Sequence, residues 1–404
     1  MRHLCISATL GGLLAAGSVS LLFEQTPQEL FAGRSPKFLA RGAHGLTLLS
    51  VRPAEGGKGQ DLYVQSSSDN GDSFAEPVRV NQVAGEVTDH GENSPLLAAS
   101  PDGQHLYVAW AGRDIRFGRS AAMRPSFSPA VTVNDDTLPV SHSFHAMGVG
   151  PDGTIYIAWL DGRDASSTHP GPHHPPISAL YLARSTDQGK TFGKNARVAG
   201  DICPCCRPSI AFAGDRVLVS WRSVEPGDIR DIFLAASDDR GLTWSKPALV
   251  ARDGWKITGC PHVGPALASL GSKLYAAWFT EGSGDPAIHL AVSDDAGKTF
   301  SGKRQVSGET LDPTHPLLVS NHEKLALVFQ ARAAGRDQGW GRVGVYYREI
   351  YSDGSLSPLA RAGEGKLNAN YPTVALGMSG RIYLGWTQSS QGASTAMMAR
   401  GRAK

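Results

Sequence analysis

The chain has 404 residues, of which 47 are glycine and 25 are proline, and it carries a formal net charge of +2. A charge this small, without a clustered basic stripe, excludes the electrostatic footprint of a nucleic-acid-binding protein. Short apolar runs separated by glycine and proline, with no convincing amphipathic helix, predict an all-β fold. A chain of this length can still be one domain if it is a repeat array.

Residues 1–24 have the features of an export signal. A short basic start precedes an apolar, small-residue segment that ends at Phe23, and a cleavage point is expected near Ser18 or Ser20. The alternative is an uncleaved anchor, because about 20 apolar residues can span a bilayer. We therefore expect a signal peptide or N-terminal anchor, followed by a single exported domain over 25–404 that is periplasmic or secreted.

One eight-residue pattern, S-x-D-x-G-x-[ST]-[FW], occurs four times after this segment. The copies are residues 67–74, 185–192, 237–244 and 293–300. The Asp carboxylate of each copy can accept backbone N–H groups of its own turn, and the Gly can take a positive φ without a Cβ clash. The closing aromatic residue can then pack the hairpin against its sheet. Such recurrence predicts a repeat architecture.

These copies resemble the Asp-box (BNR) repeats of the sialidase-like β-propellers, and the resemblance extends over nearly the whole exported chain. It implies that each box closes a hairpin between outer strands of a propeller blade. It also implies that the boxes are structural, and that they lie away from the face on which the active sites of that family are found.

A second repeat sets the number of blades. Apolar strands that end in an aromatic residue occur at residues 106–110, 155–159, 217–221, 274–278, 325–329 and 382–386, and residues 46–50 are a plausible earlier member without the aromatic. We therefore predict a seven-bladed β-propeller, with the six-bladed sialidase-type propeller as the alternative. The last unit lacks an outer strand, and we expect residues 22–31 to supply it and close the ring.

The residues just before the innermost strands are expected to form a ring at the mouth of the central channel. Most of these strand starts carry a proline, namely Pro95, Pro208, Pro265, Pro316 and Pro372. Five residues before the first three prolines stand His90, Cys203 and Cys260, and three residues before them stand Glu92, Cys205 and His262. Directly before a proline stand Arg207, His315 and Tyr371, while His142 and His145 occupy the same region of the third unit.

The four cysteines of the exported part thus fall at equivalent positions of adjacent blades. Thiolates and imidazoles suit copper or zinc, and we predict copper because thiolates hold Cu(I) well. The predicted ligands are Cys203, Cys205, Cys206, Cys260 and His262, with His90, His142, His145 and His315 nearby. A further loop, with His169, His173 and His174, either leans over the same mouth or is solvated.

Two other interpretations of the cysteines stay open. An even number of cysteines in an oxidising compartment favours disulfides, and Cys260 bridged to one of the other three would staple two blades. Against this, the neighbours Cys205 and Cys206 are hard to pair with each other without strain, and a disulfide gives no reason for the histidines. A redox or catalytic thiol is the third interpretation.

Glycoside hydrolysis is the alternative function. The resemblance implies an arginine triad for the substrate carboxylate, a Tyr/Glu nucleophile pair and an acid. By position, Arg207 matches one triad member and Tyr371 matches the nucleophile, and the candidates for the acid are Asp89 and Glu92. Residues 34–38 lack the Arg-Ile-Pro motif of the family, and one positioned arginine is too few for a carboxylate clamp.

We therefore expect a propeller that is not an active sialidase, with a diverged exo-α-sialidase or related glycoside hydrolase as the alternative. A propeller used only as a protein-binding platform is a third option. The expected partner at the channel mouth is a metal ion, or a small molecule or glycan. No nucleic acid is expected, and a membrane only if the N-terminal segment stays uncleaved.

Overall fold

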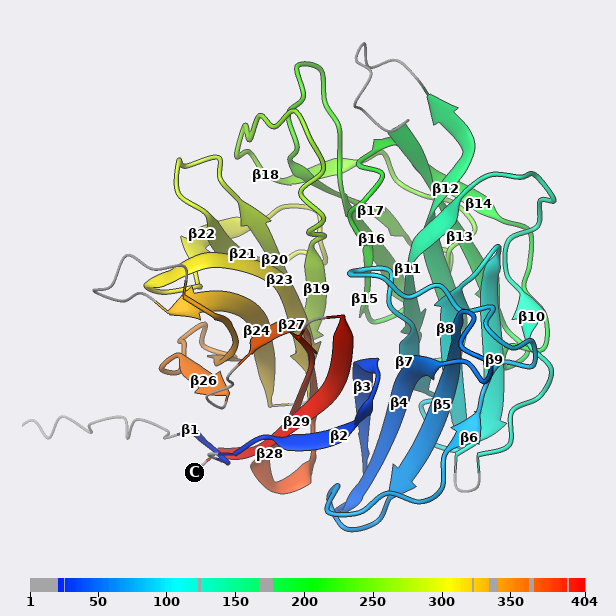
Figure 1. Ribbon diagram of the computed structural model, residues 1–404. Helices are drawn as coiled ribbons and strands as arrows, with labels where there is room; N and C mark the ends of the chain where they lie inside the picture. The colour runs from blue at the N-terminus through cyan, green and yellow to red at the C-terminus, as the bar shows by residue number, and fades with distance from the viewer. Residues whose placement is uncertain are drawn as a thin grey trace, which may run out of the picture.

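The computed structural model describes residues 21–24, 26–122, 125–166, 177–321, 323–333, 341–362, 367–390 and 392–403. Within these ranges the strands form seven antiparallel sheets around one central channel (Figure 1). The seven-bladed prediction is confirmed, and the six-bladed alternative is wrong. The loop with His169, His173 and His174 lies outside the described residues.

Helical structure in these ranges is limited to a 3-10 turn, η1 (Met378–Gly380). No helix among the described residues has the length and apolar character needed to cross a membrane.

Blades are numbered here in chain order, and the strands of each blade run outward from the channel. Blade 1 has β3 (Arg34–Arg41), β4 (Gly45–Pro53), β5 (Gln60–Ser67) and β6 (Val78–Arg79). Blade 2 has β7 (Leu96–Ala99), β8 (His105–Ala111), β9 (Ile115–Ala121) and β10 (Val131–Thr132). Blade 3 has β11 (His142–Val149), β12 (Ile155–Ser166), β13 (Ile177–Ser185) and β14 (Ala196–Ile202).

The second half of the ring repeats this order. Blade 4 has β15 (Ser209–Ala213), β16 (Arg216–Arg222), β17 (Ile232–Ser237) and β18 (Ala248–Ala251). Blade 5 has β19 (Ala266–Leu270), β20 (Lys273–Thr280), β21 (Ala287–Ser293) and β22 (Ser301–Gln305). Blade 6 has β23 (Thr310–Ser320), β24 (Lys324–Ala333), β25 (Val343–Tyr351) and β26 (Ala360–Ala362). Blade 7 has β27 (Asn368–Leu376), β28 (Arg381–Ser390) and β29 (Ala393–Ala403).

The N-terminal strands complete blade 7 and close the ring. Strand β2 (Gln28–Ala32) pairs antiparallel with β29, and β1 (Leu21–Phe23) pairs with the end of β29. In Figure 1 the blue β2 lies beside the red β29. The predicted closure by N-terminal residues is confirmed, and β1 overlaps the last residues of the predicted export segment, which itself stays a prediction.

The aromatic strand ends fill the space between blades, which explains why they recur. Trp159 of β12 is fully buried and packs with Tyr107 and Phe117 of blade 2. Trp278 of β20 packs in the same way with Leu218 of blade 4. Each blade therefore buries its apolar face against its neighbour, which drives closure of the ring.

The box hairpins lie between the third and fourth strands of their blades. In the copy after β13, Asp187 Oδ1 accepts the backbone N–H groups of Lys190 and Thr191, both at 3.0 Å. Ser185 Oγ accepts the N–H of Gly189, whose φ is +78°. The turn thus satisfies its own polar groups, as the sequence pattern predicts.

Candidate functional site

The starts of several innermost strands share an unusual backbone conformation, and the strand register shifts at four of them. Five non-glycine residues there have φ between +51° and +56°, namely Ser35, Phe144, His262, His315 and Tyr371. Such residues are strained and persist only where the surroundings hold them.

At three of these strand starts, a side chain of the preceding blade, or of the loop before it, accepts the N–H of the strained residue. The Ser35 N–H donates to Thr387 Oγ1 and the Tyr371 N–H donates to Gln330 Oε1. The Phe144 N–H donates to Asn93 Oδ1, which lies just before blade 2. The channel mouth is therefore assembled by contacts between blades.

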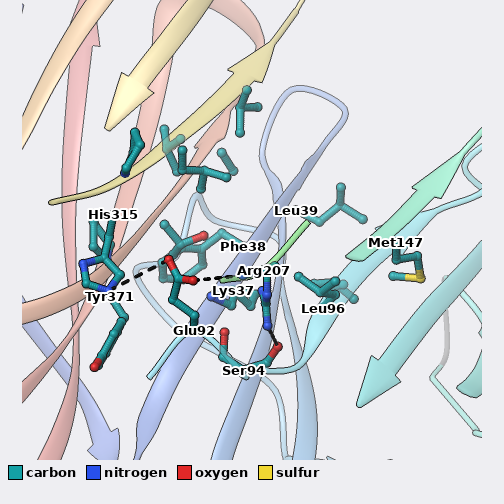
Figure 2. A pocket seen from close by; sticks show the side chains of 18 of the residues that line it. Lys37, Phe38, Leu39, Glu92, Ser94, Leu96, Met147, Arg207, His315 and Tyr371 are labelled. Atoms are coloured by element: carbon teal, nitrogen blue, oxygen red, sulfur yellow. Dashed lines mark hydrogen bonds and ion pairs between the residues drawn. The ribbon is translucent and has the colours of Figure 1, made fainter. Parts of the chain in front are cut away.

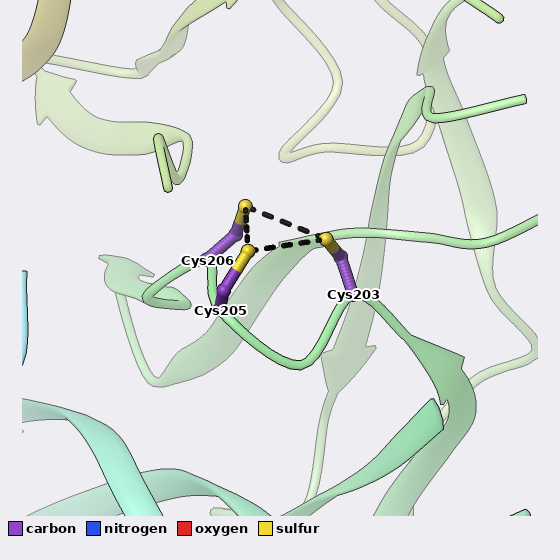
Figure 3. Close-up of side chains that lie close together, drawn as sticks. All are labelled: Cys203, Cys205 and Cys206. Atoms are coloured by element: carbon purple, nitrogen blue, oxygen red, sulfur yellow. Dashed lines mark hydrogen bonds between the residues drawn. The ribbon is translucent and has the colours of Figure 1, made fainter. Parts of the chain in front are cut away.

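Three cysteines meet in the turn before blade 4 (Figure 3). The Sγ atoms of Cys203 and Cys205 are 3.7 Å apart, those of Cys205 and Cys206 are 3.8 Å apart, and those of Cys206 and Cys203 are 3.6 Å apart. All three side chains are buried and none is in a disulfide. The thiols thus form a compact triangle, which we call the thiol cluster. Residues 203–207 are called the first cysteine loop.

Cys260 joins the thiol cluster from the turn before blade 5, which we call the second cysteine loop (residues 260–264). Its thiol interacts with those of Cys203 and Cys205, and it is half-buried and free. The sequence placed these loops at equivalent positions of adjacent blades, and the structure brings their thiols together.

A buried cation faces the thiol cluster. Arg230 is 3% exposed, and its Nη1 donates to Cys203 Sγ at 3.5 Å. The neighbouring thiols Cys205 and Cys206 donate to Cys203 and, with this cation, hold its pKa well below the ordinary value. The same interactions raise the pKa of Cys205, and the interaction with Cys203 raises the pKa of Cys260 to about 11. Of the four thiols, Cys203 is therefore the one whose pKa favours the thiolate.

The spacing of the thiols fits a bound metal ion. Sulfurs held at about 2.3 Å from one tetrahedrally coordinated ion are about 3.8 Å from each other. The distances of 3.6 to 3.8 Å within the cluster agree with this geometry. The residues present therefore fit a soft metal ion bound by three thiolates, whereas Cys260 packs against the cluster without belonging to this group of donor atoms.

The structure gives His142 and His145 neighbours other than the cysteines. His142 Nε2 lies 3.0 Å from Asp136 Oδ1 and 3.7 Å from Asp161 Oδ2. These three residues can hold a metal ion as a second group, although Arg163 already pairs with both carboxylates. His145 Nε2 donates to the Ala109 carbonyl at 3.0 Å, and burial followed by the charge of Arg207 lowers its pKa to about 3.

The other predicted histidines also have partners of their own. His90 stacks on Phe144 with ring centroids 6.1 Å apart. The His315 ring packs edge-on against Tyr371 at 5.0 Å and hydrogen-bonds the backbone of His262. Burial is the main cause that lowers the pKa of His315 to about 4. Among the described residues, the donor atoms gathered with the thiols of the first cysteine loop include no histidine, so imidazole ligation stays a prediction.

A cavity of about 480 Å³ occupies the channel, and Arg207 of the first cysteine loop lines it, while the four cysteines do not. Figure 2 shows Glu92 reaching between His315 and Arg207, with Lys37 and Tyr371 close by. His315 Nε2 is 4.0 Å from Glu92 Oε1. Arg207, Glu92 and Tyr371, which the sequence singled out, therefore share one cavity.

Burial shifts the pKa values of the groups in this cavity. It raises the pKa of Glu92 to about 7, although backbone N–H groups of Arg207 and Gly264 act against the shift. Burial and the charge of Arg207 lower the pKa of Lys37 to about 8. Burial also lowers the pKa of Arg207 to about 10 and raises that of Tyr371. The cavity thus holds an acid that titrates near neutrality and a lysine that loses its charge in mild base.

Sequence reasoning did not find Lys37, Arg230 or Gly264. Lys37 had a weak signal, since it follows the proline of a strand start in residues 34–38. Arg230 and Gly264 had none, because a buried arginine and a close backbone contact depend on tertiary structure alone.

The comparisons with known proteins identify the fold. No known family profile matches the chain, and no curated protein matches it in sequence. The solved polysaccharide lyase Uly1 has a TM-score of 0.56 at 11% identity, over 92% of this chain and 90% of that one. An ulvan lyase of polysaccharide lyase family PL25 has a TM-score of 0.53 at 12% identity, over 93% of this chain and 95% of that one.

Sialidases are also among the structures similar to this chain. The NanB sialidase from Streptococcus pneumoniae has a TM-score of 0.47 at 10% identity, over 94% of this chain and 70% of that one. At these identities the likeness shows only the fold. The chain is a seven-bladed propeller similar in architecture to these polysaccharide lyases.

Proposed function

We propose that this chain is an exported β-propeller that binds one transition-metal ion through Cys203, Cys205, Cys206 and Cys260. The observation that carries the proposal is the triangle of three buried, free thiols 3.6 to 3.8 Å apart. Cys260, from the neighbouring blade, completes the set. Copper or zinc suits such ligands.

Electrostatics support a thiolate site. A buried thiolate is costly unless a positive charge or a metal compensates it. Arg230 supplies one such charge at 3.5 Å from Cys203 Sγ, and a bound cation would balance the remaining thiolates. Cys260 is half-buried, so it is the thiol that an incoming metal donor can reach first. The other three thiols are buried away from water.

Copper is the metal we propose. Soft thiolates favour Cu(I), and copper stands above zinc in the affinity order of divalent ions. The site would then serve to sequester copper, or bound Cu(I) would supply one-electron chemistry. The protein contributes a rigid, anionic set of thiols near the channel mouth.

The test is a Cu(I) titration against a competing chelator, with reduced protein under anaerobic conditions. We expect one equivalent to bind to the wild type, and we expect Cys205→Ser and Cys260→Ser each to weaken binding at least tenfold. Asp239→Ala, a change in a remote box hairpin, controls for lost stability and should bind like the wild type. Equal affinity of the wild type and both cysteine variants would contradict the proposal.

A thiol count separates the metal site from a disulfide. Denatured protein, purified without reductant and alkylated at once, should have all four cysteines between residues 203 and 260 as reactive thiols after metal removal. A Cys260 disulfide that persists in mild reductant would instead mean that the cysteines staple blades 4 and 5.

The second candidate is a glycoside hydrolase with a diverged sialidase-type site. The observation that favours it is the shared cavity of Tyr371, Glu92 and Arg207. Arg207 is, however, the one arginine among the described residues that line this cavity. Turnover of a fluorogenic α-sialoside that Tyr371→Phe abolishes would support this candidate, and no turnover by the wild type would rule out sialidase activity.

A further inference from the structure

We propose that Glu92 is a positioning residue that holds the two cysteine loops in register, an inference that rests on the proposed metal-binding function. Glu92 Oε2 accepts the backbone N–H of Arg207 at 3.1 Å. Its Oε1 and Oε2 accept the backbone N–H of Gly264 at 3.1 and 3.2 Å. One carboxylate thus binds both cysteine loops.

This arrangement departs from that of three other strand starts at the channel mouth. The N–H groups of Ser35, Phe144 and Tyr371 each have a side-chain acceptor of their own. Glu92 lies before blade 2 but serves the loops before blades 4 and 5 together. The two loops that it joins are those that carry the cysteines, which relates Glu92 to the thiol cluster.

The two loops are in direct backbone contact at the same place. A Cβ added to Gly264 would lie 2.0 Å from the carbonyl oxygen of Arg207, so no larger residue fits without separating the loops. The fully buried Arg222 fixes the second loop from the other side, since its Nε donates to the Val263 carbonyl at 3.1 Å. The position of Cys260 relative to Cys203 is therefore set by Glu92, Gly264 and Arg222.

Removal of the Glu92 carboxylate leaves two buried N–H groups without their acceptor and lets the loops separate. No thiol needs to change for the site to loosen. Residues that orient metal ligands through such contacts typically contribute about 10–100-fold in metal affinity. We expect a loss in this range for Glu92→Ala and a smaller loss for Glu92→Gln, which keeps one acceptor oxygen.

The experiment measures loop register with and without metal. Reduced, metal-free protein is treated with the thiol cross-linker dibromobimane, and cross-links between Cys260 and the first cysteine loop are quantified by peptide mapping. Cu(I) affinity is measured in parallel. Asp89→Asn is the matched control, because Asp89 is also a buried carboxylate at the channel mouth but accepts from Ser35.

We expect Glu92→Ala to lower the cross-link yield several-fold and the Cu(I) affinity by about 10–100-fold. Asp89→Asn should match the wild type in both. Glu92→Gln keeps the proposal testable if Glu92→Ala does not fold. Gly264→Ala, in which Glu92 is intact, should also lower the cross-link yield, because its Cβ would separate the loops.

Unchanged cross-linking and affinity in folded Glu92→Ala or Glu92→Gln would overturn the proposal. A wild type that binds no Cu(I), but whose cross-link still depends on Glu92, would refute the metal function while upholding the role of Glu92 in loop register.

Discussion

The box hairpins and the channel mouth use carboxylates in opposite ways. In the box after β13, burial alone would raise the pKa of Asp187, but hydrogen bonds from Thr191 and its neighbours outweigh it and lower the pKa to about 2. At the channel mouth, burial outweighs two backbone hydrogen bonds and raises the pKa of Glu92 to about 7. The exposed carboxylate is satisfied within its own turn, whereas the buried one joins turns of different blades.

The difference shows which parts of a repeat can carry chemistry. A box turn needs no residue outside itself for its hydrogen bonds, so the same pattern serves four blades equally well. A turn at the channel mouth takes its partners from other blades, so each one has a different environment. The repeated positions specify the fold, and the positions that depart from the repeat form the candidate site.

The largest effect on stability should come from the glycine of a box. An ideal Cβ at Gly189 would lie 2.1 Å from the buried Phe117 ring, and its φ is +78°. Gly189→Ala should therefore lower the free energy of unfolding by about 2–5 kcal/mol, from overpacking and backbone strain together. Urea denaturation measures this change.

Gly354, in the turn between β25 and β26, is the control for that variant. Its φ is +84°, but no atom lies within 4 Å of an added Cβ. Gly354→Ala should thus cost only the backbone strain, about 1–2 kcal/mol. Equal losses for the two variants would show that box packing contributes nothing.

The stability contributed by Glu92 should fall as the pH rises, which is opposite to the behaviour of a box carboxylate such as Asp187. The pKa of Glu92 is raised from 4.5 to about 7, so the folded protein binds this proton more tightly than the unfolded chain. Stability from this group is therefore present below about pH 4.5 and is lost as the pH rises to about 7. Relative to Glu92→Gln, the wild type should lose up to about 3 kcal/mol across this window, as unfolding at several pH values will show. Parallel pH profiles would contradict the buried, titrating carboxyl.

The smallest effect is expected for the box carboxylate. The pKa of Asp187 is depressed from 3.8 to about 2, so its contribution is present above pH 3.8 and is lost as the pH falls through 2. Because the turn is exposed, Asp187→Asn should cost less than about 1 kcal/mol at neutral pH. Its difference from the wild type should vanish in acid, and Cu(I) binding should be unaffected. Weaker Cu(I) binding by Asp187→Asn would mean that the box hairpins are not purely structural.

Sequence predicted the fold well because its determinants are local and repeated. Each aromatic strand end, such as Trp110 or Trp278, fills an equivalent gap between blades, so the spacing of these residues counts the blades. The closure of the ring by N-terminal residues could be predicted because the last unit lacks an outer strand. Both the number of blades and this closure follow from the period of the repeat alone.

The candidate site was predictable only in part. Counting back from Pro208 and Pro265 aligned the two cysteine loops, and the structure places Cys260 beside Cys203 and Cys205. The same count paired His262 with Cys205, yet the backbone of His262, at φ +53°, hydrogen-bonds the His315 ring. Offsets give the position of a residue in a blade but not the direction of its side chain or its partner across the channel, which is why the role of Glu92 was not foreseen.

The pairing of β2 with β29 imposes an order on folding. The register Gln28↔Met398 joins residues from near the two ends of the chain, so blade 7 stays incomplete until the last strand has been synthesised. Contacts between such distant segments carry a high cost in chain entropy and form late. Until then, β2 and β28 both present open edges that can pair with other chains. The seam between the chain ends is thus where a nascent or damaged molecule is most exposed to misassembly.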